Sequence, residues 1–545
     1  MNETHVKLSN FDAVVVGAGF AGMYMLHRLR EAGFSTRVFE SGAGVGGVWY
    51  WNRYPGARCD VESIYYNYMF SEELYKGWTW THKYPDQTEI LNYLNYVADT
   101  LDLRRDIQFE TKITSAHYDE ANKQWNIKTD KGNSLTAKYF ITGVGCISAS
   151  HIPKFTGLDS FKGEWYHTAH WPHKDVNFKN KKVGIIGTGS SGIQAIPVIA
   201  KKAAHLTVFQ RTPQYSLPAR NQPLDPEYVQ NIKERFQEIR KDARASRNGY
   251  SLNATTLSTQ EVTHEEREKK YEELWQMGGV GVVQLAFNNI LTNEAANETC
   301  ANFVKKKIQE IVKDPVIAEK LSPTYPIAAK RIVLDTDYYE TYNRDNVTLV
   351  DVKKAPIIEV TPKGLRTTDE EYDLDILIFA TGFDGMTGPL LRMDIRGKDG
   401  VSLKEKWENG SQTRTYLGIA NAGFPNFFMI TGPESPSVLG NVPVAIEQHV
   451  DWIANCLEYL KANRIETIEA SKEAEEKWSR HCQEVAQNTL YVKTDSWYTG
   501  ANIEGKPKRF PIYAGGYGTY REICDEIAIK NYEGFIFVGV PLEQN

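Results

Sequence analysis

The spacing of apolar and polar positions predicts the same strand–helix–strand unit at two places in the chain. The first unit begins with an apolar strand over Asp12 to Gly17, continues as a helix from Ala21 to about Ala32, and ends in a strand over Ser35 to Glu40. The second unit has its strand from Lys182, its helix from about Ser191 and its next strand over Leu206 to Gln210. Two separate mononucleotide-type folds are therefore expected.

The pattern differs elsewhere in the chain. From about Pro226 to Glu319, polar residues with apolar positions at helical spacing predict a helical insertion. Apolar runs that end in glycine turns, Ile141 to Gly145 and Ile376 to Gly382, predict strands that return the chain to a sheet edge. Strands and helices mix after Gly382, and Phe535 to Gly539 is expected to be another strand.

Composition narrows the class of protein. The net charge of -6 provides no field that would attract nucleic acid or an anionic membrane. No run of about 18 apolar residues occurs, and the polar segment Met1 to Asn10 leads directly into a strand, so neither a membrane span nor a signal peptide is expected. Six scattered cysteines without a C-x-x-C pair favour the reducing cytoplasm and argue against a disulfide framework or a cysteine metal site. Nothing in the sequence indicates the oligomeric state.

A glycine-rich loop follows the first predicted strand. Gly17, Gly19 and Gly22 form G-x-G-x-x-G, in which the glycines permit a tight turn, a close approach of the backbone to a pyrophosphate, and packing of the helix on the strand. Glu40 ends the next strand, 23 residues after Gly17, where its carboxylate can accept hydrogen bonds from both hydroxyls of a ribose. The first unit is therefore expected to bind FAD.

The loop recurs after the second predicted strand, with a different charge at the end of the next one. Its residues are Gly187, Thr188, Gly189, Ser190, Ser191 and Gly192. The position 23 residues after Gly187 is Gln210, and Arg211 follows it. A carboxylate would repel a 2'-phosphate, whereas an arginine can pair with one, so the second unit is expected to bind NADPH.

These elements predict an α/β protein with two Rossmann-like dinucleotide-binding domains and a helical insertion. The FAD-binding domain is expected to comprise residues 1–148 and 382–545. The NADP-binding domain is expected over 149–222 and 329–381, interrupted by the insertion at 223–328.

Three classes of protein could carry one FAD site and one NADPH site. A disulfide reductase would need a cysteine pair beside the flavin, and the sequence has none. A flavin monooxygenase would need no protein nucleophile and no metal. A redox sensor that only binds both nucleotides also fits the two glycine loops.

A further motif resembles the signature of one enzyme family. The segment Phe161 to Pro172 matches the F-x-G-x-x-x-H-x-x-x-W-P signature of Baeyer-Villiger monooxygenases, and Gly46, Gly47, Val48 and Trp49 with Tyr54 to Asp60 are similar to a second family marker. The resemblance implies insertion of one oxygen atom from O2 beside a ketone carbonyl, through a C4a-peroxyflavin, to give an ester or lactone. The alternative is N- or S-oxygenation by a related flavin monooxygenase.

The resemblance also implies roles for individual residues. Arg331 matches the active-site arginine and Asp60 its carboxylate partner, Gly47 and Trp49 lie in the cofactor-binding marker, and Lys330 and Arg211 match contacts to the NADP phosphate. Trp497 resembles a residue of a loop that closes over NADP, and Ser437, Val438 and Leu439 resemble a loop that lines the substrate pocket. A fixed guanidinium would stabilise the peroxide anion and the oxyanion of the adduct, which explains the need for Arg331 in physical terms.

His167 belongs to the family signature and also to a run of three histidines with His170 and His173. Pro172 would interrupt a regular helix there and no cysteine joins the run, so a metal site is not expected. A conformational role at the junction of the two nucleotide domains is predicted for His167.

The replacement of an acid by Gln210 and Arg211 generates a test of cofactor choice. Arg211→Ala should raise the KM for NADPH about tenfold to a hundredfold, because one charge-assisted pair contributes roughly 1.5 to 3 kcal/mol. Steady-state kinetics with both coenzymes measure this, and the KM for NADH should change far less. Equal changes for both would show that Arg211 does not read the 2'-phosphate.

Overall fold

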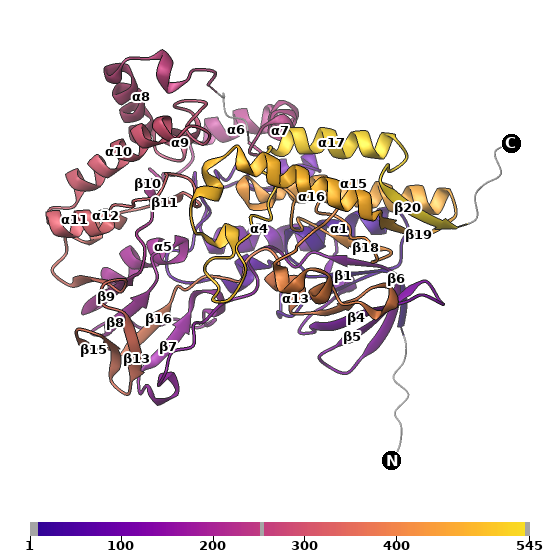
Figure 1. Cartoon of the computed structure of the whole chain (residues 1–545), viewed down its shortest axis with the longest axis horizontal. Coiled ribbons are helices and arrows are strands. Elements are labelled where there is room, and N and C mark those ends of the chain that lie inside the picture. The colour runs from indigo at the N-terminus through magenta and orange to yellow at the C-terminus, as the bar shows by residue number, and fades with distance from the viewer. Residues whose placement is uncertain (1–8, 251–254, 540–545) are drawn as a thin grey trace.

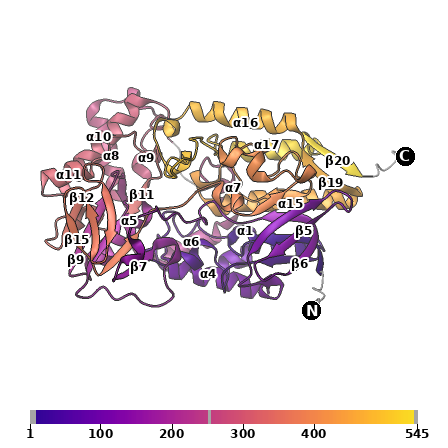
Figure 2. The same cartoon turned by 60° about the horizontal axis from the view of Figure 1, so that its bottom comes forward.

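The computed structural model describes residues 9–250 and 255–539. Residues 1–8 of the polar N-terminal segment, and the last six residues of the expected 382–545 segment, lie outside this part. The chain forms two lobes, each built on a largely parallel sheet (Figures 1 and 2). The C-terminal helices cover the lobe that contains the N-terminal strands. Within the insertion, the helices between residues 264 and 321 cover the other lobe, whereas those between 226 and 245 pack on the first lobe.

The first lobe contains an eight-stranded sheet in which β17-β4-β5-β6-β1-β2-β3 are neighbours in that order and β18 also pairs with β6. Its strands are β1 Ser9–Val16, β2 Thr36–Phe39, β3 Ile107–Gln108, β4 Ile113–Asp119, β5 Gln124–Thr129, β6 Ser134–Thr142, β17 Asp394–Arg396 and β18 Phe427–Met429. β1 is parallel to both β2 and β6, so its C-terminal end and the glycine loop that follows it lie in the middle of the sheet. This is the position where open α/β sheets bind ligands.

The second lobe contains a five-stranded, entirely parallel sheet in the order β12-β9-β8-β16-β7. Its strands are β7 Glu164–His167, β8 Lys182–Ile186, β9 His205–Gln210, β12 Val347–Asp351 and β16 Ile376–Phe379. All four residues of β16 are buried, as expected for a central strand with both faces covered. Smaller sheets join β10 Ser216–Pro218 to β11 Val333–Asp335, β13 Ile357–Thr361 to β14 Gly364–Thr367 and β15 Glu371–Asp373, and β19 Ile465–Ala470 to β20 Phe535–Gly539.

The insertion is helical, as the sequence predicts. Its helices are α6 Pro226–Glu234, α7 Phe236–Ala245, α8 His264–Met277, α9 Gly281–Gln284, α10 Glu294–Ile311 and α11 Pro315–Leu321. Asp225 and Asp314 cap helices whose first residue is proline, and their side chains accept the free backbone N–H groups of the first turn. These local signals define where the helices begin.

The helices outside the insertion are α1 Phe20–Glu31, α2 Val48–Trp51, α3 Glu72–Gly77, α4 Gln87–Thr100, α5 Ser190–Ala200, α12 Tyr338–Thr341, α13 Gly388–Leu391, α14 Leu403–Lys406, α15 Val442–Ala462, α16 Lys472–Gln487 and α17 Tyr517–Ile529.

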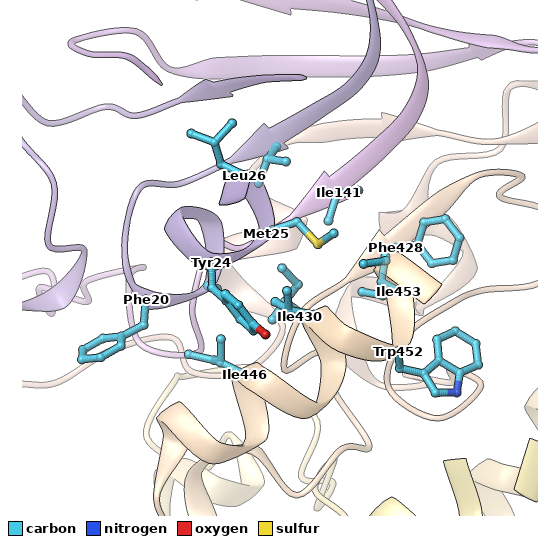
Figure 3. Close-up of a cluster of buried hydrophobic side chains, with 14 of the residues drawn as sticks. Phe20, Tyr24, Met25, Leu26, Ile141, Phe428, Ile430, Ile446, Trp452 and Ile453 are labelled. Carbon is cyan, nitrogen blue, oxygen red and sulfur yellow. The ribbon is translucent and has the colours of Figure 1, made fainter. Parts of the chain in front are cut away.

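The C-terminal third completes the core of the first lobe. Figure 3 shows Met25 of α1 and Ile141 of β6 packed with Phe428 and Ile453 from far along the chain. Residues before 142 and after 427 therefore form one hydrophobic core.

Sequence and structure agree closely for the two strand–helix–strand units. The predicted helix over 21–32 occupies Phe20–Glu31, and the predicted strand over 206–210 is β9, His205–Gln210. The division of the chain into domains and its boundaries stay a prediction. No helix in the described ranges is both long and apolar enough to cross a membrane.

Two linkers cross between the lobes side by side. Backbone hydrogen bonds run from Met386 N to Cys146 O at 2.8 Å, from Asp384 N to Ala149 O at 2.8 Å, and from His151 N to Gly382 O at 3.0 Å. Since residue numbers rise in one linker as they fall in the other, the two segments are antiparallel. The lobes are thus joined by a hydrogen-bonded pair of strands rather than by two independent tethers.

A buried ion pair fixes the loop after β18 to the C-terminal region. The Glu434 carboxylate is fully buried and accepts hydrogen bonds from the Ser479 hydroxyl at 2.6 Å, the Arg509 guanidinium at 3.0 Å and the Thr415 backbone N–H at 2.9 Å. Burial raises the pKa of Glu434, and the nearby Arg509 opposes this rise.

Removal of the Arg509 charge should therefore destabilise the fold. We expect Arg509→Met to lower the free energy of unfolding by about 3 kcal/mol or more, because it leaves Glu434 as an unpaired buried charge. Lys508→Met is the matched control: Lys508 pairs with Asp495 at 2.7 Å, but both side chains are more than 60% exposed, so a change within about 1 kcal/mol is expected. Denaturant unfolding measures both, and equal losses would contradict the role of the buried pair.

Candidate functional site

The first glycine loop is a tight turn that only glycine can make. Gly17 has φ +99°, and a Cβ there would lie 2.7 Å from the Gly143 carbonyl oxygen. A Cβ on Gly22 would lie 1.7 Å from the Gly17 carbonyl oxygen, so helix and turn are in direct backbone contact. Gly19 is the N-cap of α1, and no side chain caps the helix N-terminus. Gly47 lies against this cap, because a Cβ on Gly47 would come 3.0 Å from the Gly19 Cα.

The Glu40 carboxylate holds the loop together. Oε2 accepts a hydrogen bond from the Ala18 N–H at 2.8 Å and Oε1 accepts one from the Gly42 N–H at 2.7 Å. The sequence predicted a ribose contact for Glu40 but not this second role. The Ser41 hydroxyl also donates to Oε1 at 3.2 Å. Since a carboxylate has about four acceptor positions, capacity for a ribose hydroxyl remains.

The second glycine loop has the same shape and leaves an open space. Gly187 has φ +108° and a Cβ there would lie 2.4 Å from the Ala380 carbonyl oxygen, while a Cβ on Gly192 would lie 2.2 Å from the Gly187 carbonyl oxygen. A Cβ on Gly189 would meet no atom within 4 Å, and its φ of -81° is accessible to any residue. Neither packing nor backbone conformation therefore requires glycine at 189. The free space at the N-terminus of α5 fits a phosphate that approaches the backbone closely.

Other parts of the second loop also have defined places. The Thr188 hydroxyl is buried and donates to the Thr212 carbonyl at 3.1 Å, and Ser190 begins α5. Arg211 is exposed and follows β9 directly.

Lys330 and Arg211 lie close enough to influence each other. Burial lowers the pKa of Lys330, the Arg211 charge lowers it further, and Asp495 opposes both. The Lys330 Nζ lies 4.3 Å from the centre of the Tyr325 ring. Two cations beside one glycine loop provide the charge that a 2'-phosphate needs.

Arg331 and Asp60 form a bidentate ion pair. Nε donates to Asp60 Oδ2 at 2.8 Å and one terminal nitrogen donates to Oδ1 at 2.7 Å. The other terminal nitrogen donates to the Val438 carbonyl at 2.9 Å. Burial by itself lowers the pKa of Arg331, but the Asp60 carboxylate outweighs it and raises the pKa well above the usual value. The guanidinium is therefore permanently charged and fixed in its plane.

The predicted substrate loop contributes strained backbone and a buried hydroxyl. Ser437, Val438 and Leu439 form a short 3-10 turn. Thr431, Glu434 and Ser437 have φ of 53°, 67° and 40°, which is unfavourable for residues with a side chain. The Cys146 thiol lies 2.7 Å from the Ser437 hydroxyl, and the Tyr517 hydroxyl donates to the Ser437 carbonyl at 2.5 Å. No local pattern in the sequence indicates Cys146 or Tyr517, since both contacts are long-range.

Trp497 lies in a segment fixed to the linker between the lobes. A Cβ on Gly385 would lie 2.9 Å from the Trp497 ring. Asn502 donates to the Phe383 carbonyl at 2.7 Å, and the Lys506 ammonium donates to Asp384 at 2.5 Å. The adjacent Tyr498 is buried and close to Arg331. Tyr498 was not among the residues predicted from the sequence, and its position next to Trp497 is the signal that could have indicated it.

The Trp49 side chain is connected to the surroundings of the Arg331–Asp60 pair through the hydroxyl group of Tyr66. Its indole N–H donates to the Tyr66 hydroxyl at 3.0 Å. Burial raises the pKa of Tyr66, the charges of Cys59 and Asp60 add to this rise, and Arg331 opposes it. Trp49 thus contacts the surroundings of the ion pair rather than the pair itself.

His167 lies at the junction of the lobes. It ends β7, is buried, and accepts a hydrogen bond at Nδ1 from the Ala169 N–H at 3.0 Å. Nε2 therefore carries the proton and faces the His151 carbonyl and the Thr381 hydroxyl, both at 3.3 Å. Burial lowers the pKa of His167 to about 4, so it is neutral at pH 7. Both ring nitrogens have protein partners, and no group of three metal-ligating side chains occurs in residues 9–250 and 255–539.

The geometry defines a class of protein: two nucleotide-binding lobes of one fold, with an arginine–aspartate pair and a strained loop beside them. The family model described as flavin-binding monooxygenase-like matches residues 12–246. A Baeyer-Villiger monooxygenase of Pseudooceanicola batsensis is 45% identical over 97% of this chain and 96% of its own length. A phenazine N-monooxygenase of Lysobacter antibioticus is 44% identical over 98% of both chains.

Solved structures agree with these relatives. The structure of cyclohexanone monooxygenase from Rhodococcus sp. Phi1 bound to NADP+ has a TM-score of 0.96 and 43% identity, and the match covers 98% of this chain and 100% of that one. The chain belongs to the Baeyer-Villiger monooxygenases of the flavin-binding monooxygenase-like family.

The open space at Gly189 generates a second mutational test. Gly189→Ala should leave the melting temperature and the FAD content unchanged but weaken NADP binding about tenfold or more, because the new methyl group occupies the approach path of the phosphate. Calorimetric titration of NADP+ measures the affinity. Gly192→Ala is the contrasting variant, since its Cβ would meet backbone and should impair folding. Unchanged NADP affinity in Gly189→Ala would refute the assignment of this space.

Proposed function

We propose that this chain is an NADPH-dependent Baeyer-Villiger monooxygenase that converts a ketone and O2 into an ester or lactone. The observation that carries the proposal is the Arg331–Asp60 pair, which is held against the Val438 carbonyl of the predicted substrate loop. Family membership supports it, because the relatives with high identity over the full chain include a Baeyer-Villiger monooxygenase.

The two glycine loops supply the cofactor sites. FAD would bind at the loop Gly17 to Gly22 beside Glu40, and NADPH at the loop Gly187 to Gly192 beside Arg211 and Lys330. Bound FAD would accept hydride from NADPH and activate O2. The free N-termini of α1 and α5, neither of which has a side-chain cap, fit the two pyrophosphates.

Arg331 is the residue to which we assign the main catalytic role. A guanidinium has five N–H donors, and hydrogen bonds to Asp60 and Val438 use three of them. The N–H groups that remain can stabilise negative charge on an oxygen of the substrate without reorganisation, which is the arrangement of an oxyanion site. Asp60 positions the guanidinium, and the hydrogen bond to the Val438 carbonyl attaches the guanidinium to the loop that lines the proposed ketone pocket.

The remaining predicted residues have supporting roles in this proposal. Trp497 covers the coenzyme from the segment fixed to Phe383 and Asp384. Ser437, Val438 and Leu439 line the ketone pocket. His167 holds the linkers in register through His151 and Thr381 and takes no part in proton transfer.

The printed name of the Lysobacter antibioticus relative makes N-oxygenation the second candidate. Product analysis separates the two. The purified enzyme with NADPH and O2 should convert phenylacetone or a cyclic ketone into an ester or lactone. Exclusive formation of N-oxides or sulfoxides from amines and sulfides would favour the second candidate.

The role assigned to Arg331 predicts that its removal abolishes ester formation but not the binding of the cofactors. Arg331→Ala should reduce ester formation at least a hundredfold, because oxyanion-type stabilisation is worth roughly 3 to 4 kcal/mol. FAD and NADPH should still bind, and oxygen consumption should yield hydrogen peroxide. Parallel assays of NADPH oxidation, peroxide and ester measure this uncoupling.

Two variants serve as controls. Arg331→Lys keeps the charge but cannot form the bidentate pair, so ester formation should stay strongly reduced. Arg344→Ala removes an exposed arginine whose side chain bonds to Asn346 and, in the described part of the chain, to no other residue, so it should be neutral. Ester formation at nearly the wild-type rate in Arg331→Ala would overturn the assignment.

A further inference from the structure

A charged cavity lies between α7 of the insertion and α17, outside the glycine loops and the Arg331 site. Its volume is about 370 Å³. α7 contributes Arg240, Lys241 and Arg244, and Arg244 lies four residues after Arg240 and three after Lys241, so it neighbours both on the helix surface. α17 contributes Arg521, Glu522 and Asp525.

The backbone joins the two helices at one end of this cavity. The Tyr517 N–H donates to the Arg247 carbonyl at 2.9 Å and the Gly518 N–H donates to the Ser246 carbonyl at 3.1 Å. A Cβ on Gly518 would lie 2.3 Å from the Ala245 carbonyl oxygen, so the helices touch there. The charged side chains are thus held by a fixed frame rather than by a loop.

The positive charges exceed the negative ones. Four cations and two carboxylates line the cavity. Arg244 has partners that do not line the cavity, since its guanidinium lies 3.3 Å from Glu447 and 3.6 Å from Asp451.

Arg240 and Arg521 have no such partners. Within the described ranges, the side chain of neither residue makes a hydrogen bond or an ion pair, although Asp525 lies one helical turn from Arg521. The Nε atoms of Arg240, Arg244 and Arg521 are buried without an acceptor. Burial lowers the pKa of Arg521 and the Arg244 charge lowers it further, and Asp525, Asp451 and Glu447 do not offset this. Buried guanidinium donors beside a like charge are costly unless an anion accepts from them.

We propose that this cavity is an anion site that binds a phosphoryl group between Arg240 and Arg521. A phosphoryl oxyanion presents several acceptors at the distance that guanidinium donors require. The volume of about 370 Å³ accommodates inorganic phosphate and also the phosphate of a small organic monoester. Because Tyr517 at the start of α17 bonds to Ser437, an anion here would brace the insertion against the helix that supports the substrate loop.

Calorimetric titration of inorganic phosphate tests the proposal. The FAD-loaded enzyme is first saturated with NADP+, so that Arg211 and Lys330 are occupied, and chloride keeps the ionic strength constant. Saturable binding is expected, and Arg521→Gln and Arg240→Gln should each weaken it at least about tenfold. Two separate variants keep the test valid if one of them fails to fold.

Arg235→Gln is the matched control. Arg235 precedes α7 but lies outside the cavity and pairs with Glu238 at 2.6 Å, so this variant should bind phosphate like the wild type. Absence of saturable binding up to about 10 mM phosphate, or equal weakening in all three variants, would overturn the site. Glycerol 3-phosphate provides a second arm: tighter binding than phosphate identifies an organic monoester as the ligand, and equal binding identifies the inorganic ion. Ketone oxidation is not a readout, so the outcome is independent of the proposed function.

Discussion

The bidentate contact between Arg331 and Asp60 is the interaction on which the rest of the site depends. In the chain, Asp60 comes after the first glycine loop, Arg331 comes directly after the insertion, and Val438 belongs to the C-terminal third. The guanidinium of Arg331 bonds to both of the others. One guanidinium therefore fixes three segments that the chain brings together from different lobes. Loss of either charge would leave the other, which is partly buried, without its ion-pair partner. The charge to which we assign the catalytic role therefore also ties together segments of both lobes.

The two glycine loops show how one backbone arrangement serves two ligands. Gly17 and Gly187 have nearly the same φ, and in both loops the last glycine contacts the carbonyl of the first. The difference lies at the end of the next strand, where Glu40 holds its own loop and Arg211 stays exposed. In the proposed function, selection between the nucleotides thus depends on charge at one position, while the turn and the helix N-terminus are common to both loops.

Local signals in the sequence were sufficient for the two repeated units, because strands, helices and glycine turns there depend on neighbours. The three-stranded sheet β13–β15 was not predicted, since its strands are short and only partly apolar. The pairing of β18 with β6 and the bond from Arg331 to Val438 were also beyond prediction. Both join residues far apart in sequence, so no local pattern encodes them. Arg331 and Asp60 were found only through the family resemblance, and the structure provides the geometry.

The discontinuity of the first lobe has a consequence for biosynthesis. All strands of the second sheet are present once residue 379 has been made, whereas the first sheet still lacks β17 and β18, and α1 still lacks its cover by α15. At about 5–20 residues per second, Met25 and Ile141 wait on the order of tens of seconds for Phe428 and Ile453. The lobe that leaves the ribosome first is therefore the last to close, and its apolar surface is the part of the nascent chain that most needs protection from aggregation.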